Sequence, residues 1–240
     1  MTLFRNQGRF AGLLYVLASI VGVFGLLYVP SKIIVHGDSA ATAQNIAAHD
    51  ALFRLGIAAN LASQTLFIFV ALALFHLLQS VNRRHALAML TLILAAVPIA
   101  LLNEINSIAA LTLVGGADFL AGSDPQQRNA LAMLFLDLHG RVFDIAGILW
   151  GLWLYPLGLL VYRSGYFPRI LGIGLMVNCF AYPINSFTSI LFPQYAAIAG
   201  RWTSPLQFCE LAFILWLAIV GAKPMQPASD TAGREPLSRH

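Results

Sequence analysis

Four ionisable side chains lie within eight residues of the stretch FLDLHGRVFDIAG, in a chain of 240 residues of which 10% are charged. They are Asp137, His139, Arg141 and Asp144. On a helix, which turns about 100° per residue, Asp137, Arg141 and Asp144 share one face, and both carboxylates can pair with the guanidinium. His139 falls nearly opposite. The stretch therefore predicts an Asp–Arg–Asp stripe and a separate histidine.

Each of these two features has two interpretations. The stripe either neutralises itself where a helix enters the outer face of a membrane or lines the mouth of a binding pocket. His139 is either a histidine packed at the membrane interface or a ligand-binding group. A catalytic set of Asp137, His139 and Glu104 is a further alternative, which requires the helix to bend at Gly140.

Two more carboxylates lie inside strongly apolar segments. Glu104 shares one side of its predicted helix with Asn103 and Ser107, and Glu210 follows Gln207 by about one turn. A carboxylate inside a membrane is costly unless it is paired or protonated, and it marks a functional site by default. Both groups either bind a ligand, an ion or a proton, or form structural ion pairs with an arginine: Arg54, Arg141 or Arg201.

Amide and hydroxyl side chains form two further helical stripes. Asn60 and Gln64 are four residues apart, and Asn178, Tyr182, Asn185 and Ser189 follow a 4, 3, 4 spacing. Such groups also serve as hydrogen-bonding contacts between helices. Similar depths in five helices predict a polar pocket that opens outward. Its candidate ligand-binding residues are Glu104, Glu210, Asp144, Arg141, Asp137, His139, Asn60, Gln64, Asn103, Asn178, Tyr182 and Asn185.

Motifs for metal, haem, phosphate or nucleophilic chemistry are missing from the sequence. There is no HExxH, no CxxC, no glycine-rich phosphate loop and no nucleophile elbow. The two cysteines, Cys179 and Cys209, lie in apolar segments and suggest small buried residues. His76 and His139 are predicted at different depths, so they cannot share a haem. We therefore predict no cofactor, no metal site and no catalytic residue.

The elements that carry these side chains are predicted to be membrane-spanning helices. Hydrophobic residues make up 59% of the chain, well above the share in soluble domains. The apolar segments are long enough to cross about 30 Å of hydrocarbon. We predict an all-α, polytopic membrane protein with six spans: Phe10–Val29, Leu55–Leu78, Leu87–Val114, Val142–Tyr162, Ile170–Phe192 and Pro205–Gly221.

Short helices are expected in the outer connections. Asp38 or Ser39 can cap one of them, and Asp124 can cap another that begins at Pro125. A helix running on from Pro125 to Tyr162 would be about 57 Å long, nearly twice the hydrocarbon thickness. Its first turns must therefore project from the membrane or lie along it, with Gly140 as the expected bend.

The basic residues predict the orientation. Nine of the 14 lysines and arginines fall on the side that carries the N-terminus and, after six spans, the C-terminus. The positive-inside rule therefore predicts that both termini are cytoplasmic. It also explains the net charge of +4 without a nucleic-acid partner. We expect one bundle over residues 1–222, followed by a disordered cytoplasmic tail over residues 223–240.

Three stretches resemble a known family. They are GDSAATAQNIAAHDALFRLGI, LNEINSIAALTLVGGADFL and the run FLDLH…WGLWLYPLG…SGYFPRILG. Together they are similar to a bacterial membrane family catalogued as domain-of-unknown-function family 4386, over about residues 8–222. The resemblance implies a multi-span protein of the bacterial inner membrane. It implies no activity and transfers no site residue.

The functional expectation therefore depends on the predicted polar pocket. The sequence favours a protein that binds or transports a small molecule or an ion. One alternative is a structural or partner-binding membrane subunit without a ligand, and another is an intramembrane enzyme acting on lipid. The bilayer is the one partner that the composition requires, and the oligomeric state is left open.

Overall fold

The computed structural model describes residues 2–118 and 122–223, and within these ranges every regular element is a helix. Six helical segments in them are long and apolar enough to cross a membrane, which confirms the predicted fold class. Their bounds are Arg5–Ile33, Asp50–Leu78, Arg83–Gly115, Pro125–Ser164, Arg169–Leu191 and Pro193–Ile219.

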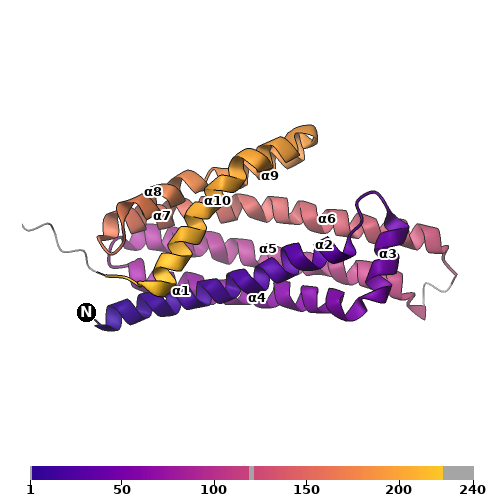
Figure 1. Cartoon of the computed structure of the whole chain (residues 1–240), viewed down its shortest axis with the longest axis horizontal. Coiled ribbons are helices and arrows are strands. Elements are labelled where there is room, and N and C mark those ends of the chain that lie inside the picture. The colour runs from indigo at the N-terminus through magenta and orange to yellow at the C-terminus, as the bar shows by residue number, and fades with distance from the viewer. Residues whose placement is uncertain (1, 119–121, 224–240) are drawn as a thin grey trace, which may run out of the picture.

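Several of these segments are composite. The first joins α1 (Thr2–Val23), a π-helical turn η1 (Phe24–Tyr28) and α2 (Val29–Ile33). The remaining elements are α3 (Ser39–Ala48), α4 (Asp50–Leu78), α5 (Arg83–Gly115), α6 (Pro125–Leu152), α7 (Leu154–Ser164), α8 (Arg169–Asn178), α9 (Ala181–Leu191), η3 (Pro193–Tyr195) and α10 (Ala196–Ile219). Figure 1 shows them as one elongated bundle.

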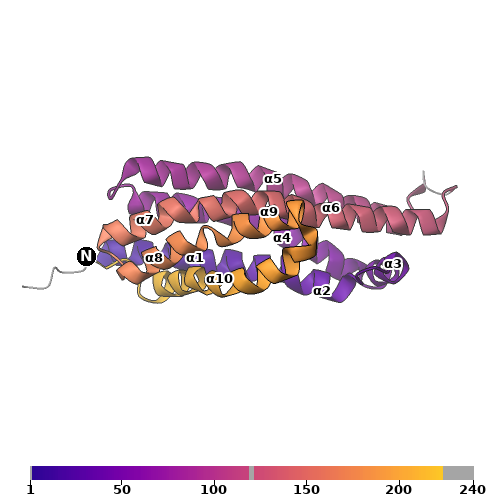
Figure 2. The same ribbon diagram turned by 90° about the horizontal axis from the view of Figure 1, so that it is seen from above.

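The connections divide between the two ends of the bundle. The start of α1, the α4–α5 and α7–α8 connections and the end of α10 lie together, whereas α3, the end of α5 and the start of α6 lie at the opposite end (Figures 1 and 2). Backbone contacts join the first group, since the Lys223 amide donates to the Tyr166 carbonyl at 3.2 Å. This arrangement fits six crossings of the membrane. Which end faces the cytoplasm stays a prediction. Of the predicted tail, residues 224–240 lie outside the described part of the chain.

Helix starts follow the capping residues expected from the sequence. The Asp38 carboxylate accepts from the Ala41 amide at 2.9 Å at the start of α3. At the start of α6, Asp124 accepts from the Gln127 amide at 3.2 Å. Asn82 caps α5 in the same way, accepting from the His85 amide at 3.1 Å. Short polar side chains thus satisfy the amides that a first helical turn leaves free.

The long fourth segment breaks at a different residue from the one expected. Helix α6 continues through Gly140 and ends at Leu152, and α7 begins beyond Trp153. Pro156, the third residue of α7, has no amide hydrogen to donate to the Leu152 carbonyl, whereas a glycine keeps its donor. Pro183 holds the same position in α9, after the break that separates α8 from α9.

The last segment corrects a second expectation. Helix α10 begins at Ala196 and carries Pro205 in its interior, so Pro205 does not start the span. The proline leaves the Arg201 carbonyl without its usual amide donor, and the Ser204 hydroxyl donates to that carbonyl instead at 3.3 Å. The helix continues past the proline, as α5 continues past Pro98.

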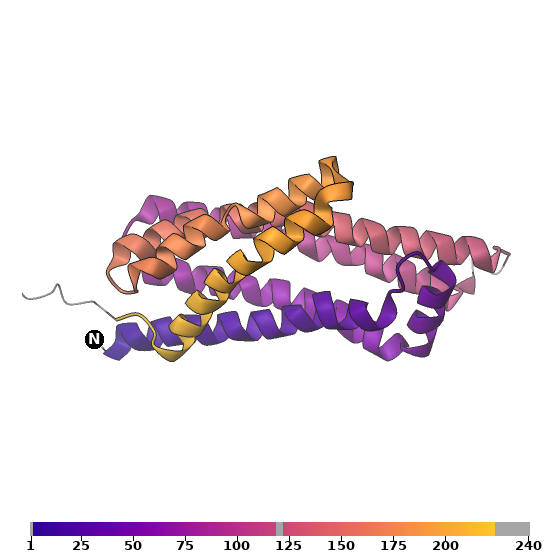
Figure 3. The same cartoon turned by 45° about the horizontal axis from the view of Figure 1, so that its top comes forward.

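Helices α1 and α10 pack closely at one end and diverge toward the other (Figure 3). A Cβ atom added to Gly12 would lie 2.3 Å from the Ala218 amide nitrogen, and one added to Gly8 would lie 2.5 Å from that of Ala222. Small residues let helix backbones approach in a membrane. Beyond this contact, the divergence of the two helices leaves room between them.

Candidate functional site

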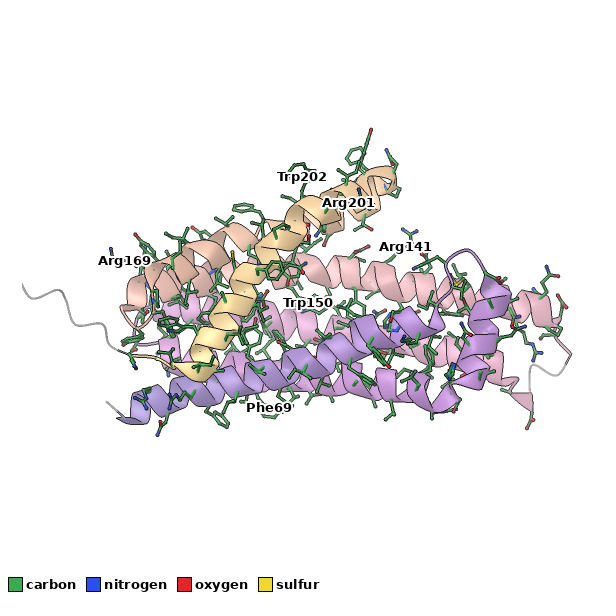
Figure 4. The ribbon with its side chains drawn as sticks, in the orientation of Figure 1. Phe69, Arg141, Trp150, Arg169, Arg201 and Trp202 are labelled. Atoms are coloured by element: carbon green, nitrogen blue, oxygen red, sulfur yellow. The ribbon has the colours of Figure 1, made fainter. Side chains whose placement is uncertain are left out.

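A cavity of about 720 Å³ lies where α1 and α10 diverge. Helix α4 and the residues around the α6–α7 break form further walls, and α9 contributes Tyr182. Its lining residues are Tyr15, Ala18, Ser19, Gly22, Val23, Leu26, Leu27, Ser63, Gln64, Phe67, Trp150, Trp153, Tyr182, Ser204, Gln207, Phe208, Glu210, Leu211 and Ile214. In Figure 4, Trp150 lies between α6 and α1, whereas Arg141, Arg201 and Trp202 point away from the bundle.

The carboxylate of Glu210 is the one acidic group among these lining residues, and two tyrosines hold it. The Tyr182 hydroxyl donates to Oε2 at 3.0 Å, and the Tyr15 hydroxyl makes a close hydrogen bond to Oε1. Tyr15 is only 1% exposed. Because the tyrosines come from α1 and α9, they orient the carboxylate from two sides of the cavity.

Exposed apolar side chains on α1, η1 and α10 form much of the rim of the cavity, beside the exposed polar residues Ser204 and Gln207 of α10. Val23, Leu27 and Phe208 are each more than half exposed, and each lines the cavity as well. In a membrane, this face of the bundle contacts lipid. The cavity therefore opens sideways between α1 and α10, at the place where the helices diverge.

A second buried polar group lies between α5 and α6, apart from the cavity lining. His139 Nε2 lies 3.0 Å from Glu104 Oε1, and the Glu104 side chain is 2% exposed. The Asn103 amide donates to the His139 backbone carbonyl at 2.9 Å and accepts from Asn106 at 2.9 Å. The other Glu104 oxygen, Oε2, is buried without a hydrogen-bond partner. The partner of Glu104 is thus a histidine on the neighbouring helix, and not one of the arginines named in the ion-pair alternative.

The Asp–Arg–Asp stripe is only partly paired. The Arg141 Nε donates to Asp137 at 2.7 Å, and both side chains are more than half exposed. Asp144 instead accepts from the Ser189 hydroxyl at 2.6 Å, which joins α6 to α9. His139 lies on the other side of α6 as the helical wheel predicts, and its ring meets that of Phe143 edge-on at 4.8 Å.

The predicted amide residues mostly contact other helices. Asn185 accepts from the Thr203 hydroxyl at 2.9 Å, which joins α9 to α10. Asn60 is buried against Gly25 of the π-helical turn, where an added Cβ would lie 2.1 Å from its Oδ1. Asn178 is fully buried, and its amide atoms have no hydrogen-bond partner. Gln64 alone among these amide residues lines the cavity, and its Oε1, like the Oδ1 of Asn60, is buried without a hydrogen-bond partner.

Comparison with known proteins places the chain in a family. Residues 10–221 match the family described as "Domain of unknown function (DUF4386)", which covers most of the chain. The chain belongs to the DUF4386 family. This confirms the resemblance seen in the sequence, and the family description carries no activity.

The chain is similar to an "Uncharacterized protein" of the archaeon Archaeoglobus fulgidus, with which it shares 37% identity over 82 residues. The match covers 34% of the chain and 48% of that relative, so it spans about half of the relative's length. No solved structure matches the chain. The comparisons therefore leave the geometry of the described residues as the basis for a function.

The predicted polar residues of the DUF4386 protein fall into separate groups. Glu210, Tyr182 and Gln64 share the cavity, whereas Glu104, Asn103 and His139 lie together between α5 and α6. The two carboxylates thus do not share one pocket: Glu210 lines the cavity, and Glu104 lies between α5 and α6. Within the described ranges, no group of three His, Cys, Asp or Glu side chains is arranged to hold a metal ion.

The sequence interpretation missed the aromatic walls of the cavity. Tyr15, Phe67, Trp150 and Trp153 all line it, and none was a candidate. One signal was available in the first span. Gly8 and Gly12 follow the small-xxx-small spacing of close helix contacts, and Tyr15 comes one turn later with a hydroxyl that needs a partner once buried.

Proposed function

We propose that this DUF4386 protein binds a small, largely apolar molecule inside the membrane, in the cavity between α1 and α10. The observation that carries the proposal is the carboxylate of Glu210, which Tyr15 and Tyr182 hold in a cavity of about 720 Å³. Small-molecule sites are typically about 300–1,000 Å³, mostly apolar, with a few placed polar groups. The cavity has this character.

The placement of the polar groups supports binding over mere helix packing. A carboxylate serving only as a contact between helices needs no space beside it, whereas Glu210 borders a cavity together with the unpaired Oε1 of Gln64. Unpaired buried acceptors are costly unless a ligand or water satisfies them. The two groups therefore give a bound molecule an orientation.

The sideways opening supports a ligand that arrives through the lipid. Its rim residues Leu27 and Phe208 are apolar and exposed, so a hydrophobic molecule can pass from the bilayer to Glu210 without crossing a charged surface. We propose that the protein lies in the inner membrane of a bacterium, as the family resemblance implies, and that both termini are cytoplasmic, as the distribution of basic residues predicts.

Two phenylalanine variants on α1 test the proposal. Ser19 lines the cavity, whereas its neighbour Ile20 is 63% exposed on the lipid face. Ser19→Phe should fill part of the cavity, and Ile20→Phe adds similar bulk outside it. Native mass spectrometry of protein extracted in mild detergent should show small-molecule adducts on the wild type and on Ile20→Phe that are missing from Ser19→Phe.

The same measurement identifies the alternative. If the wild type carries no adduct, or if all three proteins carry the same adducts, the cavity is not a binding site. The polar residues are then helix contacts in a structural or partner-binding subunit.

A further inference from the structure

Aromatic side chains are concentrated around the cavity. Six of its 19 lining residues are aromatic, against 11% of the whole chain. Three of them form a connected group beside Glu210. The Tyr15 and Phe67 rings meet edge-on at 5.3 Å, Phe67 and Trp153 at 5.8 Å, and Tyr15 and Trp153 are tilted at 6.1 Å. Ring faces carry partial negative charge and attract cations.

The cavity has no positive group of its own. None of its lining residues is Lys, Arg or His, so Glu210 is the only ionisable acid or base among them apart from the two tyrosines. The ion pairs found in the described ranges join Arg54 to Asp50, His139 to Glu104 and Arg141 to Asp137, and none involves Glu210. Arg201, one of the arginines of the ion-pair alternative, is exposed and does not line the cavity.

Two tyrosine hydroxyls occupy only part of the hydrogen-bonding capacity of the carboxylate. An ionised carboxylate has about four acceptor positions, and Tyr15 and Tyr182 use one on each oxygen. Neither tyrosine neutralises the charge. A carboxylate that stays ionised among aromatic side chains is most favourable beside an opposite charge, and none of the lining residues carries a positive one.

We infer that the cavity selects lipophilic organic cations, meaning molecules with an apolar body and one quaternary or protonated nitrogen, or its phosphonium equivalent. This inference rests on the proposed function and names the class of its ligand. Glu210 supplies the opposite charge, the six aromatic residues of the lining supply ring contacts, and the lipid-facing opening admits the apolar body. Such a cation comes either from the headgroup of an amine-bearing lipid or from a free molecule dissolved in the bilayer.

A pair of ions with the same shape and opposite charge tests the inference. Tetraphenylphosphonium and tetraphenylborate should be titrated calorimetrically into the protein in nanodiscs, with Ser19→Phe as the blank for partition into lipid. We expect the phosphonium to bind saturably and at least about tenfold more tightly than the borate. One ion pair with ring contacts contributes binding free energy of that size. The two ions are compared on the wild type, and Ser19→Phe serves only as the blank.

Variants then assign the preference to Glu210. Glu210→Gln should remove the phosphonium preference, while its amide oxygen can still accept from one tyrosine hydroxyl and its NH2 group can donate to the oxygen of the other. Asp50→Asn is the matched change, because Asp50 is a half-exposed carboxylate outside the cavity lining, and it should leave binding unchanged. A preference that survives Glu210→Gln overturns the inference.

The remaining outcomes separate the two proposals. Equal saturable binding of both ions, lost in Ser19→Phe, keeps the apolar binding site and overturns its cation selectivity. No saturable binding of either ion, together with adduct-free protein in the mass spectrometer, overturns both.

If phosphonium binds, replacing a glycolipid by phosphatidylethanolamine at constant surface charge distinguishes the sources. If phosphonium binds more weakly in phosphatidylethanolamine, a lipid amine competes for the cavity and is the natural ligand. If binding is unchanged, the ligand is a free cation dissolved in the bilayer.

Discussion

The two membrane carboxylates of this protein are stabilised by different partners. Glu104 lies against the imidazole of His139, a group that can itself carry charge, whereas Glu210 accepts from two phenols. A phenol leaves the negative charge in place, and an imidazolium would cancel it. This difference is why Glu210, beside open space, is the better anchor for a ligand and Glu104 the better helix contact.

A double-mutant cycle on Glu104 and His139 tests that assignment. Glu104→Gln and His139→Asn should each lower the free energy of unfolding by about 2 kcal/mol, as loss of a buried hydrogen bond to a charged group does. Together they should cost clearly less than the sum, because the two side chains contact each other. Unfolding in mixed micelles with increasing sodium dodecyl sulfate measures all three variants.

The exposed pair on the same helix gives the control. Asp137 and Arg141 are more than half exposed, and pairs of this kind contribute little. Asp137→Asn should therefore leave the unfolding curve unchanged. Additive effects in the Glu104–His139 cycle would contradict the assignment of that pair as a helix contact.

Sequence analysis identified these residues better than it identified their partners. The wheel correctly separated His139 from the stripe of Asp137, because both lie on one helix. It could not pair Glu104 with a residue 35 positions away, or Glu210 with Tyr15, 195 positions away. Those contacts depend on which helices are neighbours, and periodicity within one helix carries no information about that.

At the scale of the elements, the length of the hydrophobic segments predicted all six spans. The breaks within spans depend on single residues, which segment length does not identify. The breaks before Pro156 and Pro183 lie beside the cavity, which Trp153 and Tyr182 line. Pro205, by contrast, does not interrupt α10, and Pro98 does not interrupt α5. A proline alone therefore does not tell where a membrane helix ends.

Glycine positions give the clearest prediction about how the elements pack. Gly12→Ala adds a Cβ 2.3 Å from the backbone of α10 and should destabilise the protein by about 1–3 kcal/mol through overpacking. Gly140→Ala meets nothing within 4 Å on α6 and should stabilise it by about 0.5–1 kcal/mol through helix propensity. Thermal unfolding followed by size-exclusion chromatography compares the two variants.

Opposite signs for these two changes support the close approach of α1 and α10. A stabilising Gly12→Ala would mean that the two helices are farther apart than described. A destabilising Gly140→Ala would mean that α6 needs the freedom of glycine at that residue, as the original expectation of a bend required.

At the scale of the whole molecule, the cavity follows from the way the helices meet. The small residues of α1 and α10 hold the bundle together at the end where the chain begins, and the helices separate away from it. That same end carries a group of basic residues in the described ranges: Arg5, Arg9, Arg83, Arg84, Arg163, Arg169 and Lys223. If it is cytoplasmic, the cavity widens toward the outer leaflet.

Cysteine labelling decides this orientation. In a background with Cys179 and Cys209 replaced by alanine, single cysteines at exposed positions should be treated on intact cells with a membrane-impermeant maleimide. His36→Cys and Gln126→Cys lie at the end that we predict to face outward, and Ser80→Cys lies at the basic end. The first two should be labelled directly, and Ser80→Cys only after permeabilisation. The reverse pattern would place the termini outside, so that the cavity between α1 and α10 widens toward the cytoplasmic leaflet and receives its ligand from there.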